Sequence, residues 1–399
     1  MTAGGHEGGV RPRNIYLDYN ATAPLLPSAR AAMEQTLDEL GNPSSAHRLG
    51  RRARERVETA RETVARLARA RTDEVIFTSG GTEANNLALS ASLADGGEVW
   101  ASAGEHSSVL GVLEASGANW RALALTADGE ICTDALSECL SRAERPPVLL
   151  SVQAANNETG VLQPLEPVLE LSRRYSVPLH VDAAQYLGRI AASNALAEAE
   201  MVTLSAHKFG GPQGAGALVA RDASLLSPVL RGGGQENSRR AGTENVLAIA
   251  GFGAAAESVT DSDSFLRLEP LRERLEHDLR ASATEAGVEL RIAGAGVARL
   301  SNTSCFALAG GRADMHLAAL DMEGVALSSG SACSSGKIEP SHVLLAMGWS
   351  RDDARGALRL SMGWATTSAS LSRFVELWER LCLGPVARRR GARATAAAH

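Results

Sequence analysis

The chain has 399 residues, of which 44% are hydrophobic and 22% are charged, a composition typical of a soluble globular protein with a large core. The net charge of -6 and the isoelectric point near 5.9 give no general attraction to nucleic acid or to an anionic membrane, so direct nucleic-acid binding is not expected. No apolar run approaches the roughly 18 residues of a membrane span, and the N-terminal MTAGGHEGGVRPRN lacks the apolar core of a signal peptide, which predicts a cytoplasmic protein with no membrane partner.

The first predicted elements are a flexible terminus, an amphipathic helix and a strand. Residues 1–13 carry no apolar period and are expected to be flexible. In RRARERVETARETVARLARA the apolar residues recur at helical spacing, at Val57, Ala60, Val64 and Leu67. The apolar run EVIFT (Glu74–Thr78) then predicts a strand, and the glycines after it open the turn into a second helix.

Short apolar runs that stop at polar residues continue along the chain, in VLLSVQAANNETG, VPLHVDAAQ, MVTLSAHK and GALVA. Such runs are typical of an α/β fold whose mostly parallel sheet is covered by helices on both faces and collects ligand groups at the carboxyl ends of its strands. We therefore predict a large domain over residues 14–255. A smaller α+β domain is expected over residues 256–383, followed by a flexible basic tail at 384–399.

Several classes of site are excluded by counting residues. The five cysteines are odd in number, scattered and without CxxC spacing, which argues against a disulfide framework and a zinc site. GAGVAR (Gly294–Arg299) has an arginine where a dinucleotide fingerprint needs a small residue. GSACSSGK (Gly330–Lys337) has one residue too many between its glycines for a phosphate loop, so neither nucleotide motif is present.

Lys208 is one of only two lysines among the 40 Lys and Arg residues, the other being Lys337. It follows an apolar strand and precedes Gly210, Gly211, Gly214 and Gly216, which are expected to let the backbone approach a ligand closely. A primary amine condenses with an aldehyde to form a Schiff base, which a guanidinium cannot do. The alternative for Lys208 is an exposed, replaceable lysine.

Asp182 ends the apolar run VPLHVD, where an unpaired charge needs a cationic partner. The protonated pyridine nitrogen of pyridoxal 5'-phosphate (PLP) would provide one, although a helix cap or an ordinary salt bridge is the alternative. The turn Gly80-Gly81-Thr82 opens a helix and suits a phosphate. His106 and the pair Asn156-Asn157 also follow apolar strands, where such residues are otherwise structural.

These residues lie in a series of motifs that resembles the cysteine desulfurases, NifS/IscS-like PLP enzymes of fold type I within the class-V aminotransferase group. The motifs are, in order, YLDYNATAP, GNPSSAHRLG, FTSGGTEANN, AANNETGVLQP, HVDAAQ, SAHKFGGPQG, GGGQENSRRAGTEN, SSGSACSSG and LRLSMG. The resemblance covers nearly everything except the two tails, and it implies a seven-stranded sheet in the large domain. One departure is Ala23, which stands where relatives often have a second threonine.

The resemblance implies a role for each matching residue. Lys208 would carry the cofactor, and Asp182 and Gln185 would contact its pyridine nitrogen and ring hydroxyl. His106 would stack on the ring and, as a catalytic residue, would help to move protons. The phosphate ligands would be Gly81, Thr82, Ser205 and His207, with Thr243 donated across a homodimer interface. Asn157, which would also bind the cofactor, and Arg359 would hold the substrate carboxylate, the arginine as a bidentate fork.

Cys333 lies in SSGSACSSG, whose small residues suit the solvated loop that a nucleophilic thiolate needs, although an incidental thiol is the alternative. Cys305 and Cys382, in contrast, lie in apolar segments and are interpreted as core residues. The resemblance implies that the freed Lys208 amine takes the Cα proton of L-cysteine. The Cys333 thiolate then attacks the substrate sulfur, which leaves a persulfide on the enzyme and yields L-alanine.

The function expected from the sequence is therefore that of a PLP-dependent cysteine desulfurase that passes sulfur to an acceptor protein. The acceptor's pathway stays open among iron–sulfur cluster assembly, tRNA thiolation and other thiolation. Alternatives are a selenocysteine lyase, another class-V aminotransferase-type PLP enzyme, or a non-catalytic scaffold for sulfur carriers. The basic RRRGAR of the tail is expected only to aid solubility.

Overall fold

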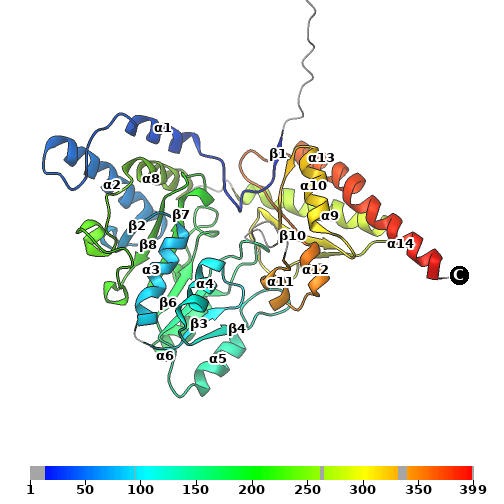
Figure 1. Cartoon of the computed structure of the whole chain (residues 1–399), viewed down its shortest axis with the longest axis horizontal. Coiled ribbons are helices and arrows are strands. Elements are labelled where there is room, and N and C mark those ends of the chain that lie inside the picture. The colour runs from blue at the N-terminus through cyan, green and yellow to red at the C-terminus, as the bar shows by residue number, and fades with distance from the viewer. Residues whose placement is uncertain (1–13, 95, 261–264, 331–338, 398–399) are drawn as a thin grey trace, which may run out of the picture.

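The computed structural model describes residues 14–94, 96–260, 265–330 and 339–397, and the predictions for residues 1–13 and for Cys333 lie outside them. The larger unit is built on a seven-stranded sheet (Figure 1). Its strands are, in sheet order, β2 (Val75–Thr78), β8 (Gly216–Ala220), β7 (Met201–Ser205), β6 (Leu179–Asp182), β5 (Leu149–Gln153), β3 (Val99–Ser102) and β4 (Trp120–Leu123). Only β8 runs antiparallel to its neighbours, which confirms the mostly parallel sheet.

Helices cover both faces of this sheet, because alternate strand residues point to opposite sides. In β2, Val75 and Phe77 pack in one core while Ile76 packs in another. The first core is completed by α1 (Pro27–Thr36), α2 (Arg48–Leu67), α5 (Thr133–Arg142), α6 (Leu165–Tyr175), α7 (Asn194–Glu198) and α8 (Val246–Thr260). The second is completed by α3 (Gly81–Ala94) and α4 (Ser107–Ser116).

The smaller unit is built on a four-stranded antiparallel sheet in the order β12 (Ser328–Ser329), β13 (Leu358–Ser361), β10 (Thr303–Leu308) and β9 (Leu290–Ile292). Its helices are α9 (Glu269–Glu285), α10 (Ala313–Met322), α11 (His342–Ala346), α12 (Arg351–Gly356) and α13 (Ser368–Trp378). Phe306 on one face of β10 and Cys305 on the other belong to separate apolar clusters, so this sheet is also packed on both faces. Within the described residues, no helix combines the length and apolar character that a membrane crossing requires.

The N-terminal segment connects the two units. Strand β1 (Ile15–Tyr16) pairs in parallel with β11 (Val325–Ala326) of the smaller unit. The chain then enters the larger unit, where the Ala23 N–H donates to the His207 carbonyl (2.8 Å). This crossing brings residues 18–22 between the two sheets, beside the ends of the parallel strands (Figure 1).

We propose that the two units divide after α8 rather than at residue 255. Ala255, Ala256 and Val259 pack in the core of the larger unit. Phe265, the next described apolar residue, packs in the core of the smaller unit.

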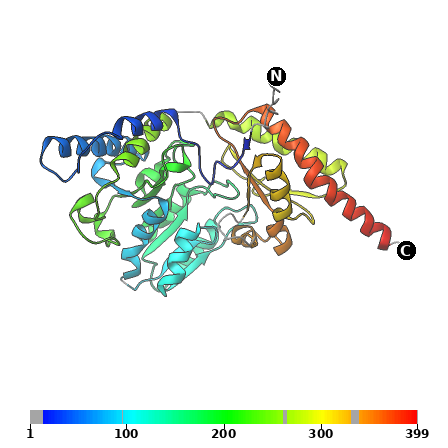
Figure 2. The same ribbon diagram turned by 45° about the horizontal axis from the view of Figure 1, so that its top comes forward.

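The C-terminal segment differs from the flexible tail that the sequence predicts. Helix α13 continues through a π-helical turn, η6 (Glu379–Leu383), into α14 (Gly384–Ala397), and Figures 1 and 2 show these elements as one rod at the edge of the smaller unit. Val386 is 4% exposed in the core of that unit. Alanine and arginine are strong helix formers, so a helix already anchored at Val386 continues into the Ala/Arg-rich end.

Candidate active site

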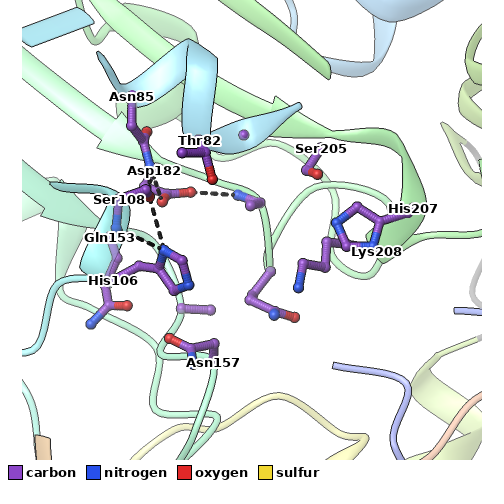
Figure 3. A pocket seen from close by; sticks show the side chains of 14 residues that line it. Thr82, Asn85, His106, Ser108, Gln153, Asn157, Asp182, Ser205, His207 and Lys208 are labelled. Atoms are coloured by element: carbon purple, nitrogen blue, oxygen red, sulfur yellow. Dashed lines mark hydrogen bonds between the residues drawn. The ribbon is translucent and has the colours of Figure 1, made fainter. Parts of the chain in front are cut away.

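A cavity of about 250 Å³ opens at the carboxyl ends of the parallel strands (Figure 3). It collects nine of the residues that the sequence predicts for cofactor or substrate: Gly81, Thr82, His106, Asn157, Asp182, Gln185, Ser205, His207 and Lys208. These residues come from the start of α3, from the loops after β3, β5 and β6, and from the ends of β6 and β7 with the turn that follows β7. Their meeting follows from the parallel sheet, which brings the ends of separate strands to one edge.

One end of the cavity suits an anion. Gly81 and Thr82 begin α3, whose first backbone N–H groups have no partners within the helix. Ser205, at the end of β7, and His207 line the same cavity. Burial, followed by the charges of Lys208 and Arg189, lowers the pKa of His207 to about 4, so its imidazole is neutral at pH 7.

Asp182 is a buried carboxylate, 7% exposed, at the end of β6. Its oxygens accept from Asn85 Nδ2 (2.8 Å) and from the Ala184 backbone N–H (3.0 Å). In the described part of the chain Asp182 forms no ion pair, so the two donors that hold it are neutral. The helix-cap alternative from the sequence is also not realised, since no helix begins after β6 until α7.

His106 caps the N-terminus of α4. Its Nδ1 accepts from the Ser108 backbone N–H (3.1 Å), which places the ring proton on Nε2 in the neutral form. Burial lowers the pKa of His106, and the nearby Asp182 carboxylate opposes this shift. The ring therefore lines the cavity as a neutral imidazole (Figure 3).

Lys208 follows the last residues of β7 in a short turn, and its Nζ donates to the backbone carbonyls of Asn20 (2.8 Å) and Ala21 (3.1 Å). The exposed-lysine alternative is wrong, because the Nζ points into the cavity (Figure 3).

Gly210 and Gly216 have a different role from the close approach to a ligand that the sequence predicts. A Cβ at Gly210 would lie 2.5 Å from Leu26 Cγ, and one at Gly216 would lie 2.6 Å from Gly80 Cα, so both glycines allow the chain to pack on itself.

Arg359 lies on β13 beside the cavity and is 2% exposed. Its Nη2 pairs with Asp18 Oδ1 (2.8 Å) and its Nη1 donates to the Asn157 carbonyl (3.2 Å). The guanidinium thus contacts the N-terminal segment and the loop that carries Asn157.

Thr243 does not line this cavity. It lines a neighbouring cavity with Ser79 and Arg240, at the outer side of the β2–α3 turn.

Among the described cysteines, burial raises the pKa of Cys305 and of Cys382 to about 12, so neither thiol is a thiolate at pH 7.

Two residues that sequence reasoning gave no role organise the site. Asn20 accepts from Lys208 and Gln185 through its carbonyl and from Arg189 through Oδ1 (2.8 Å). Asn85 Nδ2 donates to Ser108 Oγ (2.8 Å) as well as to Asp182. Asn85 lies one helical turn after Thr82, and that i, i+3 spacing is a signal that could have identified it.

The residues of the cavity fit PLP. Asp182 lacks the cation that a buried carboxylate needs, and a pyridinium nitrogen would supply it. Among the described residues, Gln185 Oε1 and Asn85 Oδ1 are buried without a hydrogen-bond partner, so acceptors for further polar groups are present. The anion-binding end and the Lys208 amine then match the phosphate and the aldehyde of the same molecule.

Comparison with known proteins gives a consistent result. Residues 15–374 match the class-V aminotransferase family. A cysteine desulfurase IscS of Dictyoglomus turgidum is 38% identical over 379 residues, covering 92% of this chain and 94% of that protein. A cysteine desulfurase of Cereibacter sphaeroides is 40% identical over 374 residues, covering 91% and 94% respectively. The solved structure of a NifS-like protein from Rickettsia africae superposes with a TM-score of 0.84 at 33% identity, covering 92% of this chain and 99% of that one.

Proposed function

Because this chain belongs to the class-V aminotransferase family and matches cysteine desulfurases along nearly its whole length, we propose roles for its residues in that reaction. The protein is a PLP-dependent cysteine desulfurase, which converts L-cysteine to L-alanine and transfers the sulfur. The observation that supports the residue roles best is the cavity itself, in which the Lys208 amine, the Asp182 carboxylate with its two neutral donors and the start of α3 face one space.

PLP supplies an aldehyde that captures amines and a ring that withdraws electrons from the substrate Cα. Asp182 would hold the pyridine nitrogen and keep it protonated, and Gln185 would hold the ring hydroxyl. The phosphate would lie against the N-terminus of α3 with Ser205 and His207. The neutral His106 would cover the ring without adding a positive charge next to the pyridinium nitrogen.

Lys208 Nζ would take the Cα proton of the substrate. The carbonyls of Asn20 and Ala21 hold this nitrogen, and an amine held in this way is oriented for proton transfer. Arg359 would hold the substrate carboxylate together with Asn157, whose carbonyl already accepts from the arginine. The Asp18 carboxylate keeps the guanidinium in place.

Cys333 would accept the sulfur. Its thiolate attacks the substrate sulfur, a new S–S bond forms as the Cβ–S bond breaks, and the electron pair of the broken bond stays with carbon, which takes up protons to become alanine. A thiolate is required for this attack, and the pKa of about 12 for Cys305 and for Cys382 makes those two thiols poor candidates. We further propose that the persulfide is passed to an acceptor protein.

A homodimer is also proposed. Large apolar side chains are exposed in the α1–α2 connection and before the loop that carries Thr243, at Leu37, Leu40, Val229 and Leu230. A second copy would cover such residues, and its Thr243, which lies outside its own cavity, would reach the partner's phosphate site.

The test is the product balance of two variants. The wild type should form alanine and transferable sulfur in equal amounts from L-cysteine. Lys208→Ala should lose both products by a factor of at least about a thousand, since the amine takes part in every turnover. Cys333→Ala should lose sulfur transfer, and undiminished transfer by that variant would contradict the proposed role. Assays with selenocysteine and keto acids separate the alternative lyase and transaminase activities, which need no Cys333.

A further inference from the structure

The loop that carries Thr243 contains three consecutive residues in the left-handed region. This loop, residues 231–245, precedes α8 and is called the Thr243 loop below. Glu236, Asn237 and Ser238 have φ angles of 46°, 56° and 63°. Left-handed backbone strains residues other than glycine, and a run of three such residues persists only where other contacts hold it. The contacts around this run should therefore be strong and specific.

A buried ion pair provides the first of these contacts. The Glu236 side chain is 2% exposed, and its oxygens accept from Arg61 Nη1 (2.7 Å) and Nη2 (2.8 Å). One of these oxygens also accepts from the Phe77 N–H (3.0 Å), and Arg61 Nη1 donates to the Val75 carbonyl (2.8 Å). Both backbone groups belong to β2, the edge strand of the sheet, so the ion pair satisfies its open side. Glu236 is thus fixed to β2.

A second ion pair fixes the loop closer to Thr243. Arg240 Nε and Nη2 donate to the two carboxylate oxygens of Glu83 (2.8 and 3.2 Å). Glu83 lies in the first turn of α3, next to Thr82, and accepts from the Ser79 N–H (2.8 Å). The Thr243 loop is therefore attached at two points to the segment that forms the anion-binding end of its own cavity.

Thr243 itself lies on the outer side of that segment. It is exposed, and the cavity that it lines is not the cavity of Lys208. The preceding residue, Gly242, donates its N–H to Oε1 of Gln235 (3.2 Å), the neighbour of Glu236. An exposed side chain on a loop held this firmly is suited to a contact that a second subunit would complete.

We propose that Glu236 is a positioning residue for PLP binding in the partner subunit, because its ion pair with Arg61 holds the loop that presents Thr243 to the phosphate there. This inference rests on the proposed homodimer and on the proposed role of Thr243. A hydroxyl strengthens phosphate binding only when it is held at hydrogen-bonding distance, so a loosened loop should weaken PLP binding. The effect should appear in the cavity of the other subunit, since Thr243 lies outside its own.

Three variants and a matched control test the ion pair. Glu236→Ala removes the buried carboxylate, Glu236→Gln keeps an oxygen acceptor but removes the charge, and Thr243→Ala removes the hydroxyl. Glu276→Ala is the control. Glu276 lies on α9 of the smaller unit and accepts from both Nη atoms of Arg299 (2.8 and 3.0 Å), with side chains 5% and 6% exposed. It therefore breaks a buried ion pair of the same geometry away from the Thr243 loop.

Titration of the PLP-free protein, followed by the absorbance of bound cofactor, measures the affinity for PLP. Thr243→Ala should weaken binding at least about tenfold and Glu236→Ala at least about fivefold, the size of a lost hydrogen bond to a charged group. Glu236→Gln should weaken it about threefold, because an uncharged acceptor remains. Glu276→Ala should bind PLP within about twofold of wild type, although both Glu→Ala variants should unfold at lower urea concentrations.

A double variant shows whether Glu236 acts through Thr243. If it does, adding Glu236→Ala to Thr243→Ala should weaken PLP binding no further, because the hydroxyl that the ion pair positions is already absent.

Mixed dimers show in which cavity the effect arises. When Glu236→Ala is refolded together with Lys208→Ala, each mixed dimer has one cavity with an intact lysine. That cavity receives Thr243 from the intact loop of its partner. Titration of desulfurase activity with PLP should then show a phase at the wild-type PLP concentration that neither variant shows alone. A merely structural role for Glu236 would leave that cavity weak and would give no such phase.

The outcomes distinguish this inference from the proposed function. Wild-type affinity in Glu236→Ala, with Thr243→Ala weakened, would overturn the positioning role and leave the role of Thr243 in place. Additive weakening in the double variant, or mixed dimers without the wild-type phase, would also overturn it. Wild-type affinity in Thr243→Ala would refute the proposed role of Thr243 and this inference with it. If Glu236→Ala fails to fold, Glu236→Gln replaces it, and wild-type affinity in that variant would overturn the inference.

Discussion

Asp182 shows how a single residue indicates the cofactor. The side chain ends a buried strand, accepts from two neutral donors and has no ion pair in the described part of the chain. A cation next to such a carboxylate offsets part of the cost of its burial. Its position opposite Lys208 in one cavity therefore matches a pyridinium ring better than a structural ion pair.

Asp182→Asn should weaken PLP binding by about tenfold or more, because a charged hydrogen bond shielded from water becomes a neutral one. Titration of the PLP-free protein, followed by the absorbance of bound cofactor, measures this. Asp134→Asn, on the exposed surface of α5, is the control and should bind PLP like the wild type. Equal affinity of Asp182→Asn and wild type would show that Asp182 has no ion-pair role.

At the scale of elements, a buried histidine joins three strands of the sheet. His180 on β6 hydrogen-bonds through Nδ1 to Ser151 on β5 (2.9 Å) and through Nε2 to Thr203 on β7 (3.1 Å). Burial lowers the pKa of His180 from 6.5 to about 4. The folded protein thus holds this ring neutral, and the ring links the strand that ends at Asp182 to both of its neighbours.

This shift predicts loss of stability in acid. Between pH 6.5 and about 4 the unfolded chain binds a proton at His180 that the folded chain does not, so stability is full above pH 6.5 and falls as the pH drops. The difference of 6.5 - 4 in pKa corresponds to at most about 3 kcal/mol. His207 and His316, each with a pKa of about 4, contribute with the same sign.

Urea unfolding at pH 7.5 and pH 5 measures the effect. His180→Gln should be less stable than the wild type at pH 7.5 but should lose less free energy of unfolding on going to pH 5. His277→Gln, an exposed histidine on α9, serves as the control and should keep the wild-type slope. An unchanged pH slope in His180→Gln would contradict the assignment.

The parts of the site that the sequence predicts are those set by local pattern. Thr82, His106 and Asp182 could be found because each follows a short apolar strand, and parallel strands bring their ends together. Asn20 and Arg189 could not be found in this way. Asn20 reaches the site because a two-residue strand pairs with β11, some 300 residues away in sequence, and so short a strand leaves no period to detect.

Arg189 is a buried cation that, like Asn20, could not be found from the sequence pattern. It is 4% exposed and donates to Asn20 Oδ1 (2.8 Å) and to the Lys208 carbonyl (3.1 Å). Burial, with the charge of Arg359, lowers its pKa to about 9. An arginine within a turn is most simply interpreted as exposed. Arg189 is buried because the N-terminal segment crosses to the larger unit and brings Asn20 next to it.

The helical C-terminal segment could not be predicted from local sequence either, because it is anchored where Val386 packs in the core of the smaller unit.

At the scale of the whole molecule, the described chain holds nearly all of one site but places Thr243 outside it. The dimer proposal predicts that mixing two defective subunits restores activity. In a mixed dimer of Lys208→Ala and Thr243→Ala, one cavity has an intact lysine and receives an intact threonine from its partner. Unfolding and refolding the two variants together should recover roughly half of the wild-type activity per mixed dimer.

The two variants refolded separately provide the baseline for that experiment. If Thr243 served the cavity of its own subunit, each cavity of the mixed dimer would carry one defect, and no activity above the baseline would appear. Sedimentation at the same concentrations establishes that mixed dimers have formed.

The central claim is that sulfur leaves L-cysteine through Lys208 chemistry and arrives at Cys333. The most direct measurement is to mix the PLP-loaded enzyme with L-cysteine in the absence of acceptor, stop the reaction after one turnover, and locate the added sulfur by peptide mass spectrometry. The account predicts one extra sulfur atom on the peptide that contains Cys333 and one alanine per subunit. Extra sulfur on a peptide with Cys132, Cys139, Cys305 or Cys382 instead, or alanine without any persulfide, would contradict it.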